Sequence, residues 1–377
     1  KEHIIGKTKS ENSIKMKIHD KKLHHKLLLY PDLYFGEAYT DGKVTFENGT
    51  LSDFLDLALE NIGRQKTNTM SDIFNTFRGS YRYLTNFNFI KKSKMNVAHH
   101  YDISDELYFL FLDPLKQYSC AYFKSDNNSL EEAQKNKINH IIKKLNIKEN
   151  SKVLDIGSGW GHLSMEIAKQ AKCQVMGVTL SENQYATAKK RAQEEGLNDK
   201  VEFVLQDYRH VESTYDRIVS VGMFEHVGVS YFSEFFSKTN KLLNDGGIFL
   251  LHTIGYKGKP TATTSWIRKY IFPGGYIPSL SEILPYIEQS NLVITDIEFL
   301  HMHYAETLSK WREKFLTQST AVDLKYGEEF RRLWEYYLVI SESAFRNEFM
   351  TVFQIQLAKR TGAVPDSRDY IYNYANM

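Results

Sequence analysis

The spacing of apolar residues along this 377-residue chain changes near position 96, and the two patterns predict two kinds of structure. Before that point, alternating apolar residues at Ile14, Met16 and Ile18 are typical of a half-buried strand. The segments 21–30 and 51–59 carry apolar residues at helical spacing, and the glycine-containing segment 36–42 between them is typical of a turn. We therefore expect a small α+β domain, with a linker, over residues 1–95.

After residue 96, short apolar runs alternate with helical stretches, which is the sequence form of βαβ units around a largely parallel sheet. A chain of 377 residues also suits two domains, because single hydrophobic cores stop growing well below this length. We expect an α/β domain with a Rossmann-like fold over residues 96–377. Its successive strands are predicted at 153–156, 174–178, 201–205, 217–221 and 248–252.

Composition and charge narrow the class of protein. Apolar residues make up 42% of the chain, enough for packed cores, and a net charge of +2 gives no reason to expect a nucleic-acid partner. Cys120 and Cys173 are the only cysteines, no apolar leader or transmembrane-length stretch is present, and a cytoplasmic location is expected. Residues 1–30 hold eight Lys against three Asp or Glu. This excess of positive charge fits an anionic phosphate surface or an ordinary solvated face.

The most specific local signal is the segment 153–161 (VLDIGSGWG), in which a predicted strand runs into three glycines and then into a helical stretch at 163–170. Gly157, Gly159 and Gly161, with Ser158 between the first two, let the backbone approach a ligand closely. The third glycine comes one residue earlier than in dinucleotide-binding loops, and Asp155 precedes the first. A carboxylate here repels a pyrophosphate but accepts hydrogen bonds from the amino group of a methionine moiety. The loop favours S-adenosylmethionine over NAD, with a structural turn as the alternative.

Polar residues after the next two strands fit the rest of this cofactor. The segment 179–184, which includes Thr179, Leu180 and Gln184, has no carboxylate at the strand end. Amide and hydroxyl groups must therefore hold the ribose or the methionine tail. After the third strand, Asp207 and Tyr208 are placed to receive the adenine, with Asp207 as an acceptor for its exocyclic amine.

A cluster of His99, His100 and Asp102 raises the question of a metal site. Adjacent histidines point apart, and no nearby cysteine or further carboxylate completes a usual ligand set. We expect no metal, and expect Tyr101 and His100 to cap the cofactor pocket instead.

Five further segments match in order: 96–102 (NVAHHYD), 117–122 (QYSCAY), 219–228 (VSVGMFEHVG), 250–255 (LLHTIG) and 266–275 (WIRKYIFPGG). Together they resemble the cyclopropane-fatty-acyl-phospholipid synthase family, which includes the mycolic acid cyclopropane synthases. The resemblance covers residues 96–377, and residues 18–42 resemble the N-terminal lipid-binding domain of bacterial members. It implies a class I S-adenosylmethionine-dependent methyltransferase fold with a seven-stranded sheet, a small N-terminal α+β lipid-binding domain and a homodimer. Residues 255–302 and the helices after position 304 would form a lid over the acyl site.

The resemblance also implies roles for site residues. Tyr118 and Ser119 would contact the cofactor beside the glycine loop. Ser158 and Ser341 stand where members of the family place cysteines, and Ser341 excludes a thiol nucleophile there. A bicarbonate ion would be held beside the transferred methyl group by Cys120, Glu225, His252, Ile254 and Tyr304, with Cys120 and Ile254 contributing main-chain groups.

The implied reaction is transfer of a methylene unit from S-adenosylmethionine to the cis double bond of an unsaturated phospholipid acyl chain, forming a cyclopropane ring. Methyl transfer leaves a carbocation that aromatic faces would stabilise, and ring closure needs a base, for which bicarbonate is suited. The alternatives are that Glu225 or His252 is itself the base, that methylation occurs without ring closure, that a small amine is N-methylated, or that the chain binds lipid without turnover.

Acyl chains must leave the bilayer to reach the site, so peripheral membrane contact is expected. The aromatic and basic segment 74–94 fits such contact or packing between domains.

Overall fold

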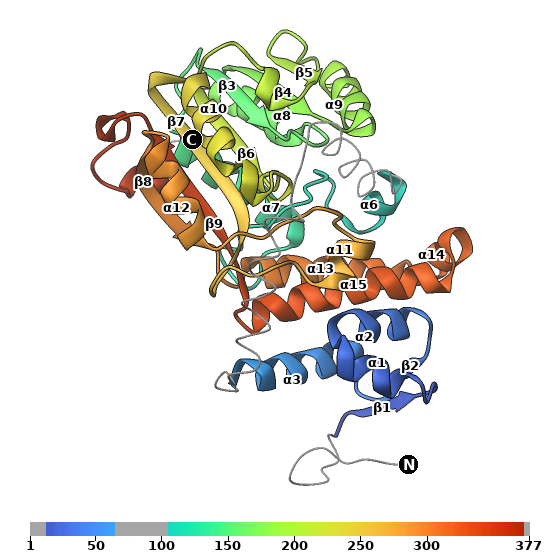
Figure 1. Cartoon of the computed structure of the whole chain (residues 1–377). Coiled ribbons are helices and arrows are strands. Elements are labelled where there is room, and N and C mark those ends of the chain that lie inside the picture. The colour runs from blue at the N-terminus through green and yellow to red at the C-terminus, as the bar shows by residue number, and fades with distance from the viewer. Residues whose placement is uncertain (1–12, 65–104, 373–377) are drawn as a thin grey trace.

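The structure, a computed structural model, describes residues 13–64 and 105–372 (Figure 1). The predicted aromatic and basic segment 74–94 lies outside the described residues, as does the cluster of His99, His100, Tyr101 and Asp102. The predicted boundary between two domains at residues 95 and 96 also lies there and stays a prediction.

Seven strands form one mixed sheet in the order β5-β4-β3-β6-β7-β9-β8. Strands β3 to β7 pair in parallel, whereas β9 lies antiparallel between β7 and β8. The expected α/β fold with a seven-stranded sheet is confirmed, and each of the five runs predicted from the sequence lies within one of its strands. The bounds are β3 Lys152–Ile156, β4 Gln174–Thr179, β5 Val201–Leu205, β6 Tyr215–Val221, β7 Leu243–Tyr256, β8 Val293–Phe299 and β9 Met350–Ala358.

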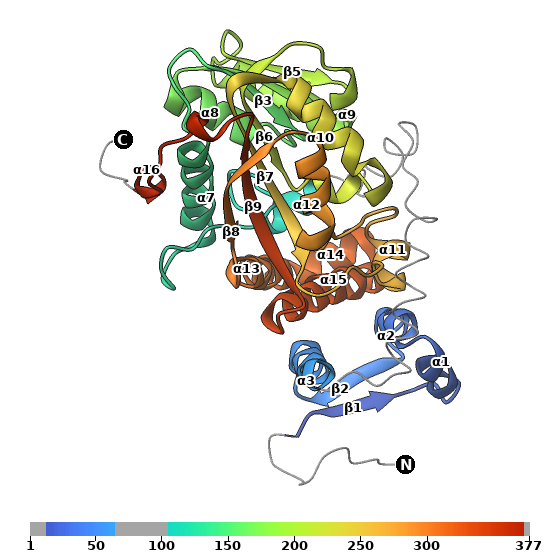
Figure 2. The same cartoon turned by 60° about the vertical axis from the view of Figure 1, so that its left-hand side comes forward.

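Helices cover both faces of this sheet, which explains why its parallel strands are continuous apolar runs. Val153 and Val219 pack toward α7, α8 and α9, whereas Leu154 and Ile218 pack toward α10 and α12. Figure 2 shows α7 and α8 on one side of the sheet and α10 and α12 on the other. The bounds are α7 Leu130–Leu145, α8 His162–Ala171, α9 Glu182–Glu194, α10 Phe232–Leu242 and α12 Leu280–Gln289.

A further layer of helices lies beyond the carboxyl ends of the parallel strands, below the sheet in Figure 1. Its core is rich in aromatic residues, with Tyr108, Trp311 and Trp334 fully buried in one cluster. Among the described residues, no helix in this layer or elsewhere is long and apolar enough to cross a membrane. The bounds are α6 Asp105–Phe111, α13 His303–Thr317, α14 Ser319–Tyr326 and α15 Glu328–Arg346, and the short α16 (Asp369–Tyr372) packs on α7.

The N-terminal unit (β1 to α3, residues 15–64) is a two-stranded antiparallel sheet with three helices. The strand and two helices predicted from the sequence are present. The prediction of a turn over residues 36–42 is wrong, because most of this segment belongs to α2. Pro31 begins this helix, where its fixed backbone is favourable, and the chain turns only at Gly42, whose φ is +71°. The bounds are β1 Lys15–Ile18, α1 Leu23–Leu29, α2 Pro31–Thr40, β2 Val44–Asn48 and α3 Leu51–Arg64.

The N-terminal unit packs against α15 and against α11 (Ser265–Tyr270) of the other layer. The ring of Trp266 lies 4.6 Å from that of Tyr336, and Phe35 of α2 packs beside Tyr336 at 6.1 Å. The Glu37 carboxylate accepts a hydrogen bond from the Tyr270 hydroxyl at 2.8 Å. The unit is therefore fixed to the two helices by buried aromatic contacts as well as by polar ones.

The lid predicted over residues 255–302 is too long. Residues 280–299 form α12 and the edge strand β8, which belong to the sheet and its helix cover. Only the connection between β7 and α12, which contains α11, crosses the carboxyl-end side of the sheet. The edge position of β8 depends on pairing with β9, some 50 residues later in the chain, so local sequence did not reveal it.

Gly36→Ala tests the packing of the N-terminal unit. A methyl group at this position would lie 2.5 Å from Trp266 Cδ1 and 2.8 Å from Tyr336 Cε1, and the buried indole cannot move away easily. Alanine normally favours a helix by about 0.5–1 kcal/mol over glycine. We expect instead a loss of about 1–3 kcal/mol in the free energy of unfolding, because the interface is overpacked. Gly362→Ala, with open space around it, is the control. Equal stability of both variants in urea unfolding would contradict the packing.

Candidate functional site

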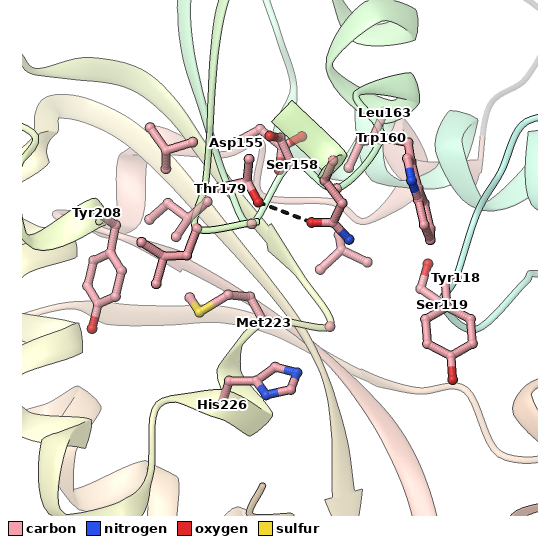
Figure 3. A pocket seen from close by; sticks show the side chains of 18 of the residues that line it. Tyr118, Ser119, Asp155, Ser158, Trp160, Leu163, Thr179, Tyr208, Met223 and His226 are labelled. Atoms are coloured by element: carbon pink, nitrogen blue, oxygen red, sulfur yellow. Dashed lines mark hydrogen bonds between the residues drawn. The ribbon is translucent and has the colours of Figure 1, made fainter. Parts of the chain in front are cut away.

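A first pocket opens at the carboxyl ends of β3, β4 and β5 (Figure 3). Eleven of the twelve residues predicted to bind the cofactor line it. Gly161 does not, and lies behind the loop, where a side chain would meet Phe203 Cζ at 2.5 Å. The eleven are Tyr118, Ser119, Asp155, Gly157, Ser158, Gly159, Thr179, Leu180, Gln184, Asp207 and Tyr208.

The glycine loop connects β3 to α8 with positive φ at all three glycines. A side chain on Gly157 would meet Met223 Cβ at 2.7 Å, so this glycine permits close approach to the loop after β6. Gly159 has open space beside it. The loop therefore presents backbone to the pocket, as predicted, while Gly161 serves the packing of the loop against α9 and β5.

Asp155 lies at the floor of the first pocket and is buried. Its Oδ2 accepts a hydrogen bond from the Ser164 hydroxyl at 2.7 Å. Burial raises the pKa of this carboxyl to about 6, against the opposing effects of Ser164 and Lys137. An acid held in this way next to the glycines is suited to a cationic amino group.

The strand ends β4 and β5 supply the polar rim of the pocket. The Thr179 hydroxyl donates to Gln184 Oε1 at 3.1 Å, drawn as a dashed line in Figure 3, so the NH2 group is what Gln184 can offer a ligand. The Asp207 carboxylate accepts from Arg209 Nε at 2.9 Å and from Nη2 at 2.7 Å. Burial alone would raise the pKa of Asp207, but these hydrogen bonds lower it. Arg209 therefore already donates to both Asp207 oxygens, which we expected from the sequence to accept a hydrogen bond from the adenine amine.

A second, larger pocket adjoins the first, and Tyr118, Ser119, Gly222 and His226 line both. Its volume is about 330 Å³, against about 150 Å³ for the first. Much of its wall is apolar and comes from α15, α13, the connection 261–277 and Leu59 of α3. All five residues predicted to hold bicarbonate line it: Cys120, Glu225, His252, Ile254 and Tyr304.

Glu225 follows β6 in a short 3-10 turn, and its carboxylate is buried at the edge of the second pocket. Oε1 accepts the Ile254 N–H at 2.6 Å, whereas Oε2 has no hydrogen-bond partner among the described residues. Burial raises the pKa of Glu225 to about 7. The Ile254 N–H, expected to bind an anion, is therefore committed to Glu225, while Oε2 is the polar atom left to meet a small ligand.

His252 lies on β7 opposite Gln354 of β9. The Gln354 amide nitrogen lies 3.1 Å from Nδ1 of the ring, and because that nitrogen can only donate, the ring proton is on Nε2. Burial lowers the pKa of His252 to about 3, and Lys137 and Lys144 add to the effect. The ring is therefore neutral, with one N–H donor for the pocket.

Side chains of α7 form hydrogen bonds to the segment 117–119, of which Tyr118 and Ser119 line both pockets. The ammonium group of the fully buried Lys137 donates to Ser119 Oγ at 2.9 Å and to Gln117 Oε1, and Gln134 donates to the Ser119 carbonyl at 2.9 Å. Burial lowers the pKa of Lys137 to about 8. Sequence reasoning missed Lys137, Gln134 and Gln354, because each acts through a partner distant in the chain.

Other residues that line the first pocket were also missed, among them Trp160, Met223, His226 and Arg209. For His226 a signal existed, since it directly follows Glu225 in one of the matching segments. Among the described residues, no group of three or more His, Cys, Asp or Glu is placed to hold a metal ion.

The part of the chain that carries these pockets matches a known family. The profile described as "Mycolic acid cyclopropane synthetase" matches residues 89–355. The cyclopropane-fatty-acyl-phospholipid synthase of Escherichia coli (strain K12) is 38% identical over 328 residues, covering 87% of this chain and 83% of that protein. The chain belongs to the cyclopropane synthase family.

Two further matches are a relative from Mycobacterium tuberculosis and a solved structure. Tuberculostearic acid methyltransferase UfaA1 is 34% identical over 339 residues, covering 86% of this chain and 78% of that protein. The crystal structure of mycolic acid cyclopropane synthase CmaA1, described as complexed with SAH and CTAB, is 31% identical with a TM-score of 0.67, covering 70% of this chain and 97% of that one. The class I methyltransferase fold expected from the sequence is thereby confirmed.

Gln354→Leu tests the orientation of His252 in this cyclopropane synthase family member. Loss of the hydrogen bond to Nδ1, about 1–1.5 kcal/mol, would lower turnover roughly tenfold while leaving the Kd for the methyl donor unchanged. Gln356→Leu is the matched control, since Gln356 is buried on the same face of β9 but donates to the Lys144 carbonyl and the Tyr370 hydroxyl. A similar fall in turnover for both variants would show that only general packing is involved.

Glu225→Gln tests the burial of this acid through stability. Folded Glu225 keeps its proton up to about pH 7, whereas the unfolded chain releases it near the ordinary value of 4.5, so rising pH between these values favours unfolding of the unsubstituted protein. We expect the stability difference in favour of the variant to grow by about 2 kcal/mol from pH 5 to pH 8 in carbonate-free buffer. Urea unfolding measures it.

The exposed Glu313→Gln on α13 is the control, and its effect should stay within about 0.5 kcal/mol at each pH. If the free energy of unfolding of Glu225→Gln differs from that of the unsubstituted protein by the same amount at every pH, the buried carboxyl is not protonated in the folded state as we expect.

Proposed function

We propose that this chain transfers a methylene unit from S-adenosylmethionine to the cis double bond of an unsaturated phospholipid acyl chain and closes a cyclopropane ring. The observation that supports this most directly is the junction of the two pockets. A polar, glycine-lined pocket meets a larger apolar one, and Glu225 and His252 lie in the wall of the second. The names of the Escherichia coli relative and of the similar crystal structure, a mycolic acid cyclopropane synthase, agree with this chemistry.

The first pocket fits the methyl donor, which supplies an electrophilic sulfonium methyl group when bound. Asp155 would accept the amino group, and backbone at Gly157 and Gly159 would approach the methionine part. The polar groups of Gln184 and the Tyr208 ring would hold the ribose and adenine. Tyr118 and Ser119, which belong to both pockets, would position the donor beside the acyl chain.

The second pocket fits an acyl chain, because its walls are long, apolar and aromatic. The alkene electron pair forms a bond to the methyl carbon, the sulfur keeps the electrons of the broken bond, and one former alkene carbon becomes cationic. Rings such as Tyr304, Tyr337 and Phe272 line this pocket and present faces that stabilise a cation without attacking it.

Ring closure requires loss of a proton from the new methyl group, whose C–H electrons then form the third ring bond. Bicarbonate is proposed as the base that takes this proton. Once Glu225 is ionised, near or above pH 7, its Oε2 would accept the bicarbonate O–H, and the Nε2–H of His252 would donate to the charged oxygens of the ion. The neutral state of His252 and its donor role make it a positioning group here rather than the base.

Methylation without ring closure is the second candidate, since the first bond-forming step is the same. One relative is named as a tuberculostearic acid methyltransferase, which keeps this alternative open for a chain that is 34% identical to it. N-methylation of a small amine fits less well, because an amine of that size would leave most of the apolar pocket unused. A homodimer, peripheral contact with the membrane and a cytoplasmic location remain proposals that follow from the family and the substrate.

The test is incubation of the protein with S-adenosylmethionine and vesicles of a monounsaturated phospholipid, followed by proton NMR of the extracted acyl chains. Upfield ring methylene signals are expected. New methyl doublets would select the branching reaction, and unchanged vinyl signals would reject both.

The same assay in buffer stripped of carbon dioxide addresses the base. Turnover should fall and recover when bicarbonate is added. Glu225→Gln should be slow and should not respond to added bicarbonate, and undiminished turnover without bicarbonate would exclude this ion as the base.

A further inference from the structure

The end of α1 exposes apolar side chains that the N-terminal unit does not need for its own core. Leu23 is buried and Leu27 packs beside it in the small core of the unit. The next three residues instead face solvent, with exposed fractions of 82% for Leu28, 73% for Leu29 and 59% for Tyr30. Contiguous exposure of this kind is unusual on a folded surface and marks a contact site.

Exposed basic residues lie on this helix and just before it. Lys26, His24 and His25 on α1 are exposed, as are Lys21 and Lys22 in the turn that precedes it. Asp20 is the neighbouring acid, and its carboxylate accepts the Lys22 N–H at 2.8 Å. Lys26 lies over the ring of Tyr34 at 5.0 Å and so borders the apolar tip. The helix thus combines an apolar end with a positively charged flank.

We propose that the tip of α1 (Leu28, Leu29 and Tyr30) inserts into the surface of an anionic phospholipid bilayer, with the three lysines on the lipid phosphates. Exposed apolar side chains on a helix with exposed lysines are typical of surfaces that lie at the boundary between headgroups and acyl chains. Each lysine adds electrostatic attraction near an anionic leaflet.

A second copy of this chain fits the patch less well. A stable interface buries on the order of 800 Å² per partner, which two leucines and a tyrosine cannot supply. A two-fold contact would also bring the lysines of both copies close to one another, which like charge opposes. The bilayer offers both an apolar phase and opposite charge.

The position of α1 links the bilayer to the apolar pocket. Figure 2 shows α1 at the right-hand edge of the N-terminal unit, beside α2 and away from α3, with α15 above the unit. On the side that faces α15, α2 and α3 pack against that helix, and Leu59 of α3 and Ile340 of α15 line the apolar pocket. The small unit therefore contacts lipid at this edge and the acyl site on the side that faces α15, a link that rests on the proposed function.

The experiment compares Leu28→Ser/Leu29→Ser with the unchanged full chain in co-sedimentation with vesicles of phosphatidylglycerol and phosphatidylcholine. Apparent vesicle affinity should fall at least tenfold in the double variant. The control is Leu324→Ser on α14, whose side chain is 85% exposed, and it should bind within about twofold of the unchanged chain. Thermal unfolding of all three proteins should coincide, because the substituted side chains are exposed.

A triple variant, Lys21→Gln/Lys22→Gln/Lys26→Gln, tests how much the positive charge contributes to vesicle binding, separately from insertion of the apolar side chains. It should lose the preference for anionic over neutral vesicles while keeping the weaker binding to neutral ones. Equal vesicle binding by the double variant and the unchanged chain would overturn the proposal. A changed oligomeric state of the double variant without vesicles would also overturn it, by assigning the patch to a protein contact.

Activity measurements distinguish this inference from the proposed function. The double variant should lose transfer to lipid in vesicles but keep transfer to the same lipid dispersed in detergent micelles. If the unchanged chain binds vesicles through α1 yet modifies no lipid in micelles, the membrane contact stands and the proposed reaction fails.

Discussion

The register between β6, β7 and β9 is the constraint on which the site depends. Val221 at the end of β6 pairs with His252 on β7, and His252 pairs with Gln354 on β9. Glu225 lies one short turn beyond Val221 and reaches back to the Ile254 N–H, two residues after His252. A slip of one residue in any of these pairings would turn His252 to the opposite face of the sheet and remove both contacts.

Burial shifts the pKa of each ionisable group around the site toward its neutral form, although Asp155 and Lys137 still carry most of their charge at pH 7. Burial raises the pKa of Asp155 and Glu225 and lowers the pKa of His252 and Lys137. Such groups cost stability, and the structure offsets the cost with neutral partners, such as Ser164 for Asp155 and Gln354 for His252. The site therefore offers a small anion hydrogen-bonding groups without placing a strong nucleophile beside the apolar pocket.

The N-terminal unit joins the acyl side of this site to the surface of the molecule. One side of it meets α11 and α15 through Phe35, Trp266 and Tyr336, and its edge carries the exposed end of α1. A phospholipid has apolar acyl tails and a polar head, so an enzyme acting on a tail needs an apolar passage next to a polar surface. Rigid aromatic packing between the unit and the pocket wall keeps the two at a fixed distance.

The sequence by itself determined the elements whose signals are local. Buried parallel strands appear as apolar runs, and the glycine loop with Asp155 appears as a spacing, so five strands of the sheet and nine of the pocket residues could be predicted from local signals. The family resemblance added Tyr118, Ser119, Glu225, His252 and Tyr304, which periodicity does not distinguish from core residues. Tertiary structure decided the rest, because the deciding contacts join distant residues. Gln354 reaches His252 across 102 positions, and the edge strand β8 gains its place only through β9. Residues 36–40 belong to α2, and the glycine at position 36 leaves room for Trp266, a partner that no local pattern indicates.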